Sequence, residues 1–321
     1  LTHFFTDIHL QKEQFFCFMG QMLILFMILM APIRSLSFDH LFGNDNFVFN
    51  KDENSVSLSL DDRTGSGFVS HQMYRHGEFS AAIKLPTNYT AGVVVAFYMS
   101  NSELFPTNHD EIDFEFLGGK KWRIQTNIYG NGSTGTGREE RYNLWFDPSH
   151  AFHRYAVVWT ESVVVFFVDD VAIREVRRVG GEFPSKPMRV YGTIWDGSDW
   201  ATCGGKCKVD YRYSPYTSEF RGFVLHGCVT GPIQELPKCD VEPSVSDVSL
   251  SLAQRRQMDR YRSKYMSYSY CYDRRRYAAA QPECNIKTEE ANELRSRDPT
   301  TFGSLNRRQG SSIRRHNRSR H

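Results

Sequence analysis

Short apolar runs of β type dominate the chain from about residue 45 to 215. The runs are rich in β-branched and aromatic residues, and Gly, Asn, Asp and Pro separate them. They cover residues 92–99, 111–116, 122–129, 154–160, 162–170, 188–195 and 207–213. Many short strands without intervening helical patterns predict an all-β fold, an antiparallel β-sandwich jelly roll of the concanavalin-like kind. Asp169 and Asp170 are expected to form a hairpin turn between two of these strands.

The pattern changes after about residue 222. Residues 249–268 predict an amphipathic helix in which Leu252, Met258, Tyr261 and Tyr265 share a face. The helix lies between two pairs of cysteines, so we expect a small C-terminal extension held on the sandwich by disulfides. The predicted organisation is an upstream segment with a signal peptide (1–36), a β-jelly-roll catalytic domain (37–222), the C-terminal extension (223–286) and a basic disordered tail (287–321).

Both ends of the chain carry biased sequence. Residues 22–31 form an apolar run too short to span a bilayer comfortably, and small residues follow it, as in a signal peptide. The alternatives are a short membrane anchor or a buried helix. We interpret the run as a secretion signal, with no membrane attachment after cleavage. The last 21 residues contain six arginines and no acid, which is typical of a solvated tail or of weak attraction to a polyanion.

The overall charge narrows the class of partner. The formal net charge of +2 indicates neither nucleic acid nor a membrane surface as a partner, and we expect a monomer. Glycosylation sequons begin at Asn88, Asn131 and Asn317, and they would be usable in the secretory pathway.

The cysteines agree with an extracellular protein. Apart from Cys17 in the upstream segment there are six, an even number that suggests disulfides but allows fifteen pairings. Pairing of neighbours is the simplest arrangement, Cys228 with Cys239 and Cys271 with Cys284. "CGGKC" (203–207) resembles half of a zinc ligand set, although no second pair of ligands completes it. Cys203 and Cys207 can pair with each other only through a tight turn.

The stretch 111–116 carries the candidate chemistry. Side chains alternate along a strand, so three carboxylates project from one face and three large apolar groups from the other. The alternative to a catalytic site is a half-buried strand whose outer face happens to be acidic. Three like charges raise at least one pKa, however, and two carboxyls of different protonation state perform glycoside hydrolysis. The Cα atoms of the outer two are about 13 Å apart, whereas a retaining pair needs carboxyls about 5 to 5.5 Å apart, so the side chains must lean together. The carboxylates are Glu111, Asp113 and Glu115.

The motif "HDEIDFEFLG" (109–118) resembles the active-site strand of the plant xyloglucan endotransglucosylase/hydrolases in glycoside hydrolase family 16. The resemblance continues from about residue 38 to 286, and the extended basic C-terminus is most similar to the family's third group. It implies a retaining, endo-acting enzyme that cleaves the β-1,4-glucan backbone of xyloglucan through a glycosyl-enzyme intermediate. The fragment would pass to another xyloglucan chain, in the cell wall or apoplast, with no cofactor and no metal. The alternatives are a predominantly hydrolytic enzyme and a non-catalytic glycan-binding jelly roll.

The same resemblance implies residue roles. Glu111 would be the nucleophile, Glu115 the general acid/base and Asp113 the assisting carboxylate. The implied substrate-binding residues are His109, Gln125, Asn127, Trp195, Trp200 and Arg276. The sequence departs from the family in two places: the loop after residue 117 is shorter and lacks a sequon, and Cys203 and Cys207 have no counterparts that we can match.

Overall fold

The computed structural model describes residues 38–231 and 249–302. The predicted signal peptide, Cys239, Asn317 and the end of the basic tail lie outside these residues. Within the described ranges, no helix is both long enough and apolar enough to cross a membrane.

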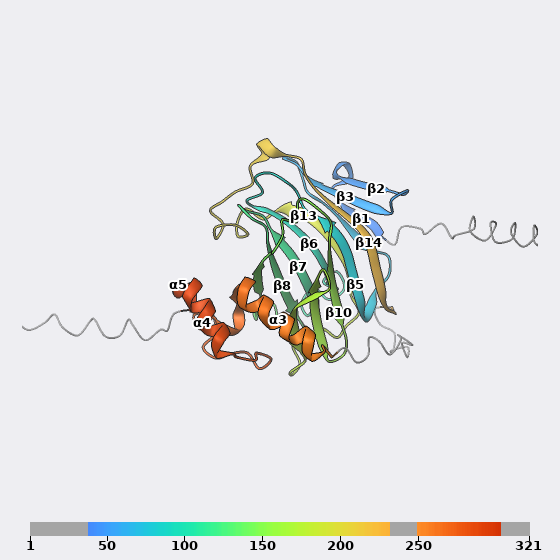
Figure 1. Cartoon of the computed structure of the whole chain (residues 1–321). Coiled ribbons are helices and arrows are strands. Elements are labelled where there is room, and N and C mark those ends of the chain that lie inside the picture. The colour runs from blue at the N-terminus through green and yellow to red at the C-terminus, as the bar shows by residue number, and fades with distance from the viewer. Residues whose placement is uncertain (1–37, 232–248, 303–321) are drawn as a thin grey trace, which may run out of the picture. The chain divides into compact units, whose positions relative to one another are not determined.

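Fifteen strands and three α-helices make up the described part of the chain, with one short 3₁₀ helix relevant below (Figure 1). The strands are β1 (Phe38–Phe42), β2 (Phe47–Asn50), β3 (Ser55–Leu60), β4 (Ser66–Ser70), β5 (Tyr74–Lys84), β6 (Val93–Ser100), β7 (Glu111–Leu117), β8 (Arg123–Tyr129), β9 (Glu140–Asn143), β10 (His153–Trp159), β11 (Val163–Val168), β12 (Val171–Arg177), β13 (Arg189–Asp196), β14 (Tyr216–Val229) and β15 (Met266–Ser269). The helices are α3 (Leu252–Tyr265), α4 (Thr288–Arg297) and α5 (Pro299–Phe302), and the 3₁₀ helix is η2 (Tyr211–Tyr213).

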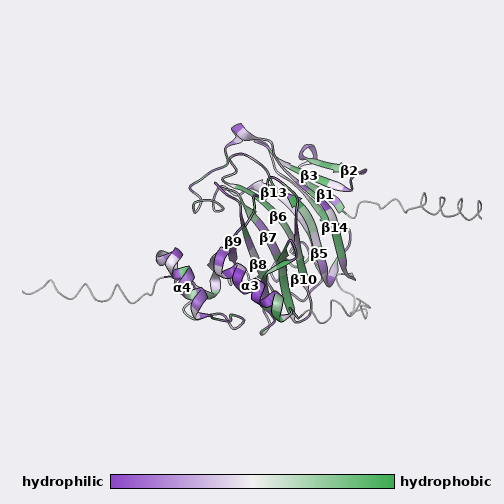
Figure 2. Ribbon diagram, viewed as in Figure 1, coloured by the Kyte–Doolittle hydropathy of each residue, from purple (hydrophilic) through white to green (hydrophobic). Residues whose placement is uncertain are grey.

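The strands form two antiparallel sheets, which confirms the predicted β-sandwich. The first sheet, which we call the cleft sheet, has the order β1-β4-β13-β6-β7-β8-β9-β15. The second sheet has the order β12-β11-β10-β5-β14-β3-β2. Aromatic side chains of the two sheets meet between them: the rings of Phe114 and Phe166 lie 5.2 Å apart, and those of Phe116 and Tyr155 lie 4.6 Å apart. Figure 2 shows this apolar character along the central strands.

Most of the predicted strands are present. The turn at Asp169 and Asp170 joins β11 to β12, and both residues have positive φ, as a tight hairpin turn requires. The prediction of a strand at 207–213 is wrong, because the stretch begins at a disulfide and ends in η2. β14 runs straight through the predicted domain boundary at 222, so the sandwich ends later than expected.

The C-terminal extension packs on both sheets. Met258 of α3 belongs to an apolar cluster with Val163, Val165 and Ala172 of the second sheet, and β15 pairs with β9 at the edge of the cleft sheet. The predicted helix is confirmed, with Met258 and Tyr261 buried as expected. Leu252 was expected on the same face but is 74% exposed, because the helix begins at this residue.

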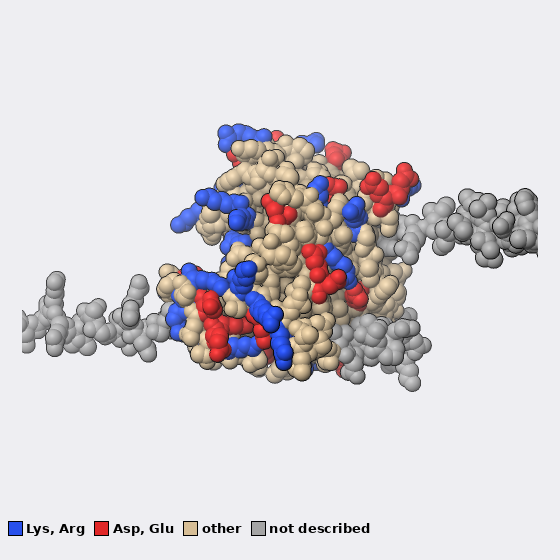
Figure 3. Space-filling view, in the orientation of Figure 1, with Lys and Arg blue, Asp and Glu red and all other residues tan. Residues whose placement is uncertain are grey.

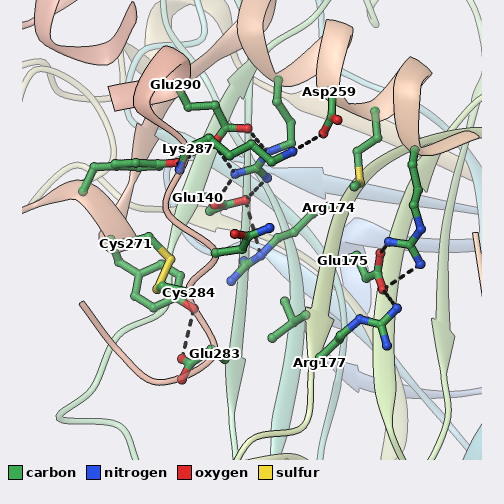
Figure 4. Close-up of a pocket in the computed structure, with 17 residues that line it drawn as sticks. Glu140, Arg174, Glu175, Arg177, Asp259, Cys271, Glu283, Cys284, Lys287 and Glu290 are labelled. Carbon is green, nitrogen blue, oxygen red and sulfur yellow. Dashed lines mark hydrogen bonds and ion pairs between the residues drawn. A yellow bond between two sulfur atoms is a disulfide. The ribbon is translucent and has the colours of Figure 1, made fainter. Parts of the chain in front are cut away.

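A buried ion-pair network connects the extension to the cleft sheet (Figure 4). Arg262 of α3 donates to Glu140 of β9 at 2.6 and 2.9 Å and to Glu290 of α4 at 2.9 and 3.2 Å. Arg174 lies 3.5 Å from Glu140, and these groups border a cavity of about 280 Å³. On the face seen in Figure 3, acidic and basic side chains lie next to one another over α3 and α4. One ion pair of the extension joins Lys287 Nζ to Asp259 Oδ1 at 2.6 Å.

The predicted start of the disordered tail needs correction. Residues 288–302, assigned to the tail from their charged composition, form α4 and α5. Leu294 and Glu290 are buried, and Glu290 is held by Arg262, a partner that sequence pattern alone does not reveal.

The disulfides follow the simplest pairing where both partners are described. Cys271 is bonded to Cys284, as predicted, and Cys203 is bonded to Cys207, which removes the zinc alternative. The predicted pairing of Cys228 involves Cys239, which is outside the described residues.

Candidate active site

The carboxylate strand β7 lies near the middle of the cleft sheet, between β6 and β8. Its apolar side chains Ile112, Phe114 and Phe116 are fully buried between the sheets. The alternate positions face the other way, and the register places Asp113 opposite Tyr98 of β6 and Asn127 of β8. The strand therefore presents its three acids on the surface of the cleft sheet that lies away from the second sheet.

All three acids line one cavity of about 530 Å³. Neighbouring strands contribute their own alternate residues, and the loop after β13 contributes one tryptophan. The lining residues other than the acids are Phe42, Ala96, Tyr98, Gln125, Asn127, Tyr129, Glu139, Arg141, Thr193, Trp195 and Trp200.

The environment raises the pKa of every acid in the triad. Burial raises the pKa of Glu111, although a hydrogen bond with Ser100 and the nearby His109 act in the opposite direction. Burial, followed by the charges of Glu111 and Glu115, raises the pKa of Asp113 well above its usual value. Burial also raises the pKa of Glu115 to about 7, against the effect of the hydrogen bond from Gln125.

A hydrogen bond between Asp113 and Glu111 separates their protonation states. It raises the pKa of Asp113 and lowers that of Glu111. A protonated Asp113 that donates to an ionised Glu111 has this effect on both groups. The hydrogen bond therefore favours ionisation of Glu111 over that of Asp113, while Glu115, with a pKa of about 7, is partly protonated near neutral pH.

Amide side chains on β8 orient the acids. Gln125 Nε2 donates to Glu115 Oε2 at 2.5 Å, and Arg141 Nε fixes the amide by donating to Gln125 Oε1 at 2.6 Å. Asn127 Oδ1 accepts a hydrogen bond from the backbone N–H of Arg138 at 2.9 Å, and a hydrogen bond from the Asn127 side chain lowers the pKa of Asp113. Both residues predicted on this strand thus lie beside the acids.

The remaining predicted residues divide into two groups. Trp195 and Trp200 line the cavity, with ring centres 6.0 Å apart and a tilt of 40° between the rings. His109 lies at the start of β7, with Nε2 3.9 Å from Glu111 Oε2. Arg276 does not line the cavity. It binds Glu139, which does, at 2.6 and 3.2 Å.

Asp110 is a positioning residue that sequence reasoning missed. It is fully buried directly before β7, and its carboxylate accepts from Lys186 Nζ at 2.8 Å and from the backbone N–H groups of Asn131, Ser185 and Lys186 at 2.6, 2.7 and 2.8 Å. These bonds fix where the carboxylate strand begins. Its place beside His109 in the motif was the available signal.

Other missed residues belong to neighbouring strands. Tyr98, Thr193 and Arg141 face the cavity because their strands pair with β7, directly or through a neighbour, and share its alternation. No feature of their local sequence marks them, so only the pairing register identifies them. Among the described residues there is no group of three or more His, Cys, Asp or Glu side chains suited to holding a metal ion.

The predicted glycosylation sites are exposed where they are described. Asn88 lies on the loop before β6 and Asn131 on the turn after β8, and both have positive φ. Whether they carry glycans remains a prediction of the sequence.

Known proteins match the chain along most of its length. The model of glycosyl hydrolases family 16 matches residues 35–213, and that of the xyloglucan endo-transglycosylase C-terminus matches residues 241–284. The probable xyloglucan endotransglucosylase/hydrolase protein 27 of Arabidopsis thaliana is 56% identical over 301 residues, 90% of each chain. Protein 28 of the same plant is 54% identical over 84% of this chain and 83% of its own.

A solved structure supports the fold. The β-glucanase of Bacillus licheniformis, 22% identical, superimposes with a TM-score of 0.50 over 59% of this chain and 93% of its own, which confirms the jelly roll. The family resemblance of the carboxylate motif is confirmed: this protein belongs to the xyloglucan endotransglucosylase/hydrolases of glycosyl hydrolases family 16.

Proposed function

We propose that the protein is a retaining xyloglucan endotransglucosylase. The observation that carries the proposal is the opening of three acids, from alternate positions of one strand, onto a single cavity that also holds two tryptophans. A binding module gains nothing from clustered negative charge with raised pKa values, whereas glycosyl transfer requires carboxyls in different protonation states. We infer that the donor and the acceptor are both xyloglucan chains or oligosaccharides.

The first half of the reaction uses both glutamates. The ionised Glu111 attacks the anomeric carbon, and a C–O bond to Glu111 forms while the glycosidic C–O bond breaks. Glu115 gives its proton to the departing glucan oxygen, which leaves as a hydroxyl. Asp113 stays protonated and holds the orientation of Glu111 through their hydrogen bond. The product is a glycosyl ester on Glu111 and an ionised Glu115.

The second half regenerates the enzyme. Glu115 takes the proton of an incoming sugar hydroxyl, whose oxygen displaces Glu111 from the anomeric carbon. If water enters instead, the outcome is hydrolysis. Tryptophan rings provide flat apolar surfaces for glucosyl rings, and Gln125 and Asn127 have amides suited to equatorial hydroxyls.

The C-terminal extension supports transfer over hydrolysis. β15 widens the cleft sheet beyond β9, and Tyr268 lies under Arg141, with the guanidinium 5.1 Å from the ring centre. Arg276 of the extension binds Glu139 at the cavity wall. The extension therefore adds polar and aromatic groups behind Arg141 and Glu139 at the cavity wall, on a side where an acceptor chain can compete with water.

Product sizing tests the proposal. Purified protein is incubated with xyloglucan, with and without a labelled xyloglucan oligosaccharide. We expect label in long chains and few new reducing ends. Rapid formation of reducing ends would make the protein a hydrolase, and saturable binding without any product would make it a glycan-binding jelly roll.

The Glu111→Ala variant provides the matching control. It removes the proposed nucleophile, so we expect turnover to be lost while xyloglucan binding stays measurable. Undiminished turnover would refute the role of Glu111.

We also propose that the protein acts outside the cell, in the plant cell wall, as a monomer. The signal-like run at 22–31 and the bonds Cys203–Cys207 and Cys271–Cys284 support an oxidising compartment. Immunolocalisation of the full chain in plant tissue tests the location, and light scattering of the purified protein tests the oligomeric state.

A further inference from the structure

The loop between β13 and β14 carries one of the two cleft tryptophans and also a disulfide. Trp200 is 36% exposed and lines the cavity, and three residues later Cys203 begins a small ring that closes at Cys207. The two Cα atoms of the disulfide are 5.5 Å apart. Residues 197–210 belong to no strand or helix, so sheet hydrogen bonds do not hold this tryptophan in place.

The disulfide ring packs closely against the backbone just before Trp200. Gly205 has a φ of +81°, and a Cβ atom there would lie 2.0 Å from the carbonyl oxygen of Asp199. Lys208, directly after the ring, donates from Nζ to Asp199 Oδ1 at 2.8 Å. The backbone N–H groups of Gly205 and Cys207 both donate to the carbonyl of Thr202, at 3.0 and 3.4 Å. The ring and the tryptophan turn are thus packed as one unit.

Thr202 connects this unit to the carboxylate strand. Its hydroxyl donates to the carbonyl of Gly118 at 2.6 Å and accepts from the backbone N–H of Gly92 at 2.9 Å. Gly118 directly follows β7, and Gly92 directly precedes β6. Thr202 therefore fixes the position of the disulfide ring relative to β6 and β7, the two strands that form the floor of the cleft.

We propose that the Cys203–Cys207 disulfide is a positioning element for the glucan chain, which holds Trp200 beside Trp195 so that the two rings form a prearranged stacking surface. The inference rests on the proposed function. Cys203 and Gly204 both have left-handed backbone conformations. Because this conformation is uncommon for a residue other than glycine, Cys203 would leave it readily in a loop without the disulfide. Without the bond, Trp200 must be ordered each time a chain binds, and this cost weakens binding. The acids lie on β7 within the sheet, so the chemical step keeps its geometry.

Kinetics of the Cys203→Ser/Cys207→Ser double variant test the proposal. We expect KM for xyloglucan to rise about 2- to 10-fold, the cost of ordering one or two side chains, with kcat within about twofold of wild type because the acids are untouched. Lys206→Ala, an exposed change inside the same ring, keeps the bond and is expected to leave KM unchanged.

Combination with Trp200→Ala identifies the route. If the bond acts through Trp200, the triple variant has the KM of Trp200→Ala alone, because the two changes share one effect. An unchanged KM in the double variant, additive effects in the triple variant, or a fall in kcat alone would each overturn the proposal. If the wild type has no turnover at all, the proposed function fails instead, and the two failures are distinguishable.

Reduction of the folded wild type provides a second route if the double variant does not fold. A dithiol supplies two electrons and two protons, the bond becomes two thiols, and the reductant becomes a disulfide. Alkylation and mass spectrometry identify protein in which Cys203 and Cys207 are reduced and Cys271 and Cys284 are intact. We expect the same rise in KM in that sample, and an unchanged KM would overturn the proposal.

Discussion

Two groups of buried acids in this protein have opposite electrostatics. In the cleft, burial raises the pKa of Glu115 to about 7, and the nearby charges of Glu111 and Glu139 act in the same direction. In the network under the extension, burial alone would raise the pKa of Glu140, but Arg262 and Arg174 outweigh it and lower the pKa to about 2. Burial is common to both, so the nearby counter-charge decides the sign of the shift.

The difference separates catalysis from stability. Glu140 is ionised, fully paired and part of the contact that attaches α3 and α4 to the cleft sheet. Within residues 38–231 and 249–302, the direct hydrogen-bond partner of Glu115 is the amide of Gln125, and Arg141 is connected to Glu115 through this amide. A carboxyl left without a cation keeps its proton at neutral pH, which a general acid requires and a stable core does not favour.

The largest expected effect is loss of the proton donor. In Glu115→Gln the side chain keeps its shape but cannot give a proton to the leaving oxygen. We expect kcat on xyloglucan to fall by about 10²- to 10⁴-fold, the usual contribution of general acid/base catalysis. Steady-state assays measure it, and the conservative Glu115→Asp variant, if active, shows whether reach also matters. Retention of wild-type kcat in Glu115→Gln would remove Glu115 from the mechanism.

Removal of the cation in the network should affect stability instead. Arg262→Met leaves Glu140 and Glu290 buried without their main partner, and we expect a loss of about 3 to 5 kcal/mol in the free energy of unfolding. Denaturant titration measures this loss. Arg260→Met on the exposed side of the same helix serves as the control and should change little. A small effect of Arg262→Met would mean that apolar packing of α3 holds the extension.

The two regions should also give opposite slopes of stability with pH. Folding raises the pKa of Glu115, so the folded state binds more protons between about pH 4.5 and 7, and stability from this group is lost as pH rises through that window. Folding lowers the pKa of Glu140, so its contribution is lost as pH falls from about 4.5 to 2.

Glu115→Gln isolates the first slope. The amide cannot ionise, so we expect the variant to be more stable than wild type at pH 8 by about 1 to 3 kcal/mol, with a smaller difference at pH 5. Thermal unfolding at the two pH values measures the difference. Equal stability at pH 8 would mean that Glu115 is solvated well enough to ionise without penalty.

The smallest expected effect is a shift of the basic limb of the pH–activity profile. The hydrogen bond from Gln125 lowers the pKa of Glu115, so Gln125→Leu should raise it and move the limb upward by about one pH unit. Glu139→Gln is the opposing variant, because the charge of Glu139 raises the same pKa. Shifts of the same sign in both variants would contradict this account.

Local pattern predicted the parts of the site that depend on local geometry. Alternation along residues 111–116 placed acids and aromatics on opposite faces correctly, since a strand has only two faces. The apolar spacing of Met258 and Tyr261 likewise predicted the buried side of α3. Motif resemblance, not pattern, singled out Trp195 and Trp200.

Side-chain partners that composition does not reveal explain the failures. Residues 207–213 have the composition of a strand, but Cys207 is bonded back to Cys203 and Asp210 caps a 3₁₀ turn by accepting from Arg212. Residues 288–297 have a charged composition that resembles a disordered tail. They form a helix because Arg262, more than twenty residues away, pairs with Glu290 and stabilises it. Arg276 reaches the cleft only through Glu139, which no spacing predicts.

The pairing of β15 with β9 has a consequence for the fate of shortened chains. Without β15, β9 would present unsatisfied backbone N–H and C=O groups at the edge of a seven-stranded sheet, and such edges recruit strands from other molecules. The extension therefore protects the edge of β9 from self-association. A chain cut before residue 249 should aggregate and precipitate and should not give a shorter soluble enzyme.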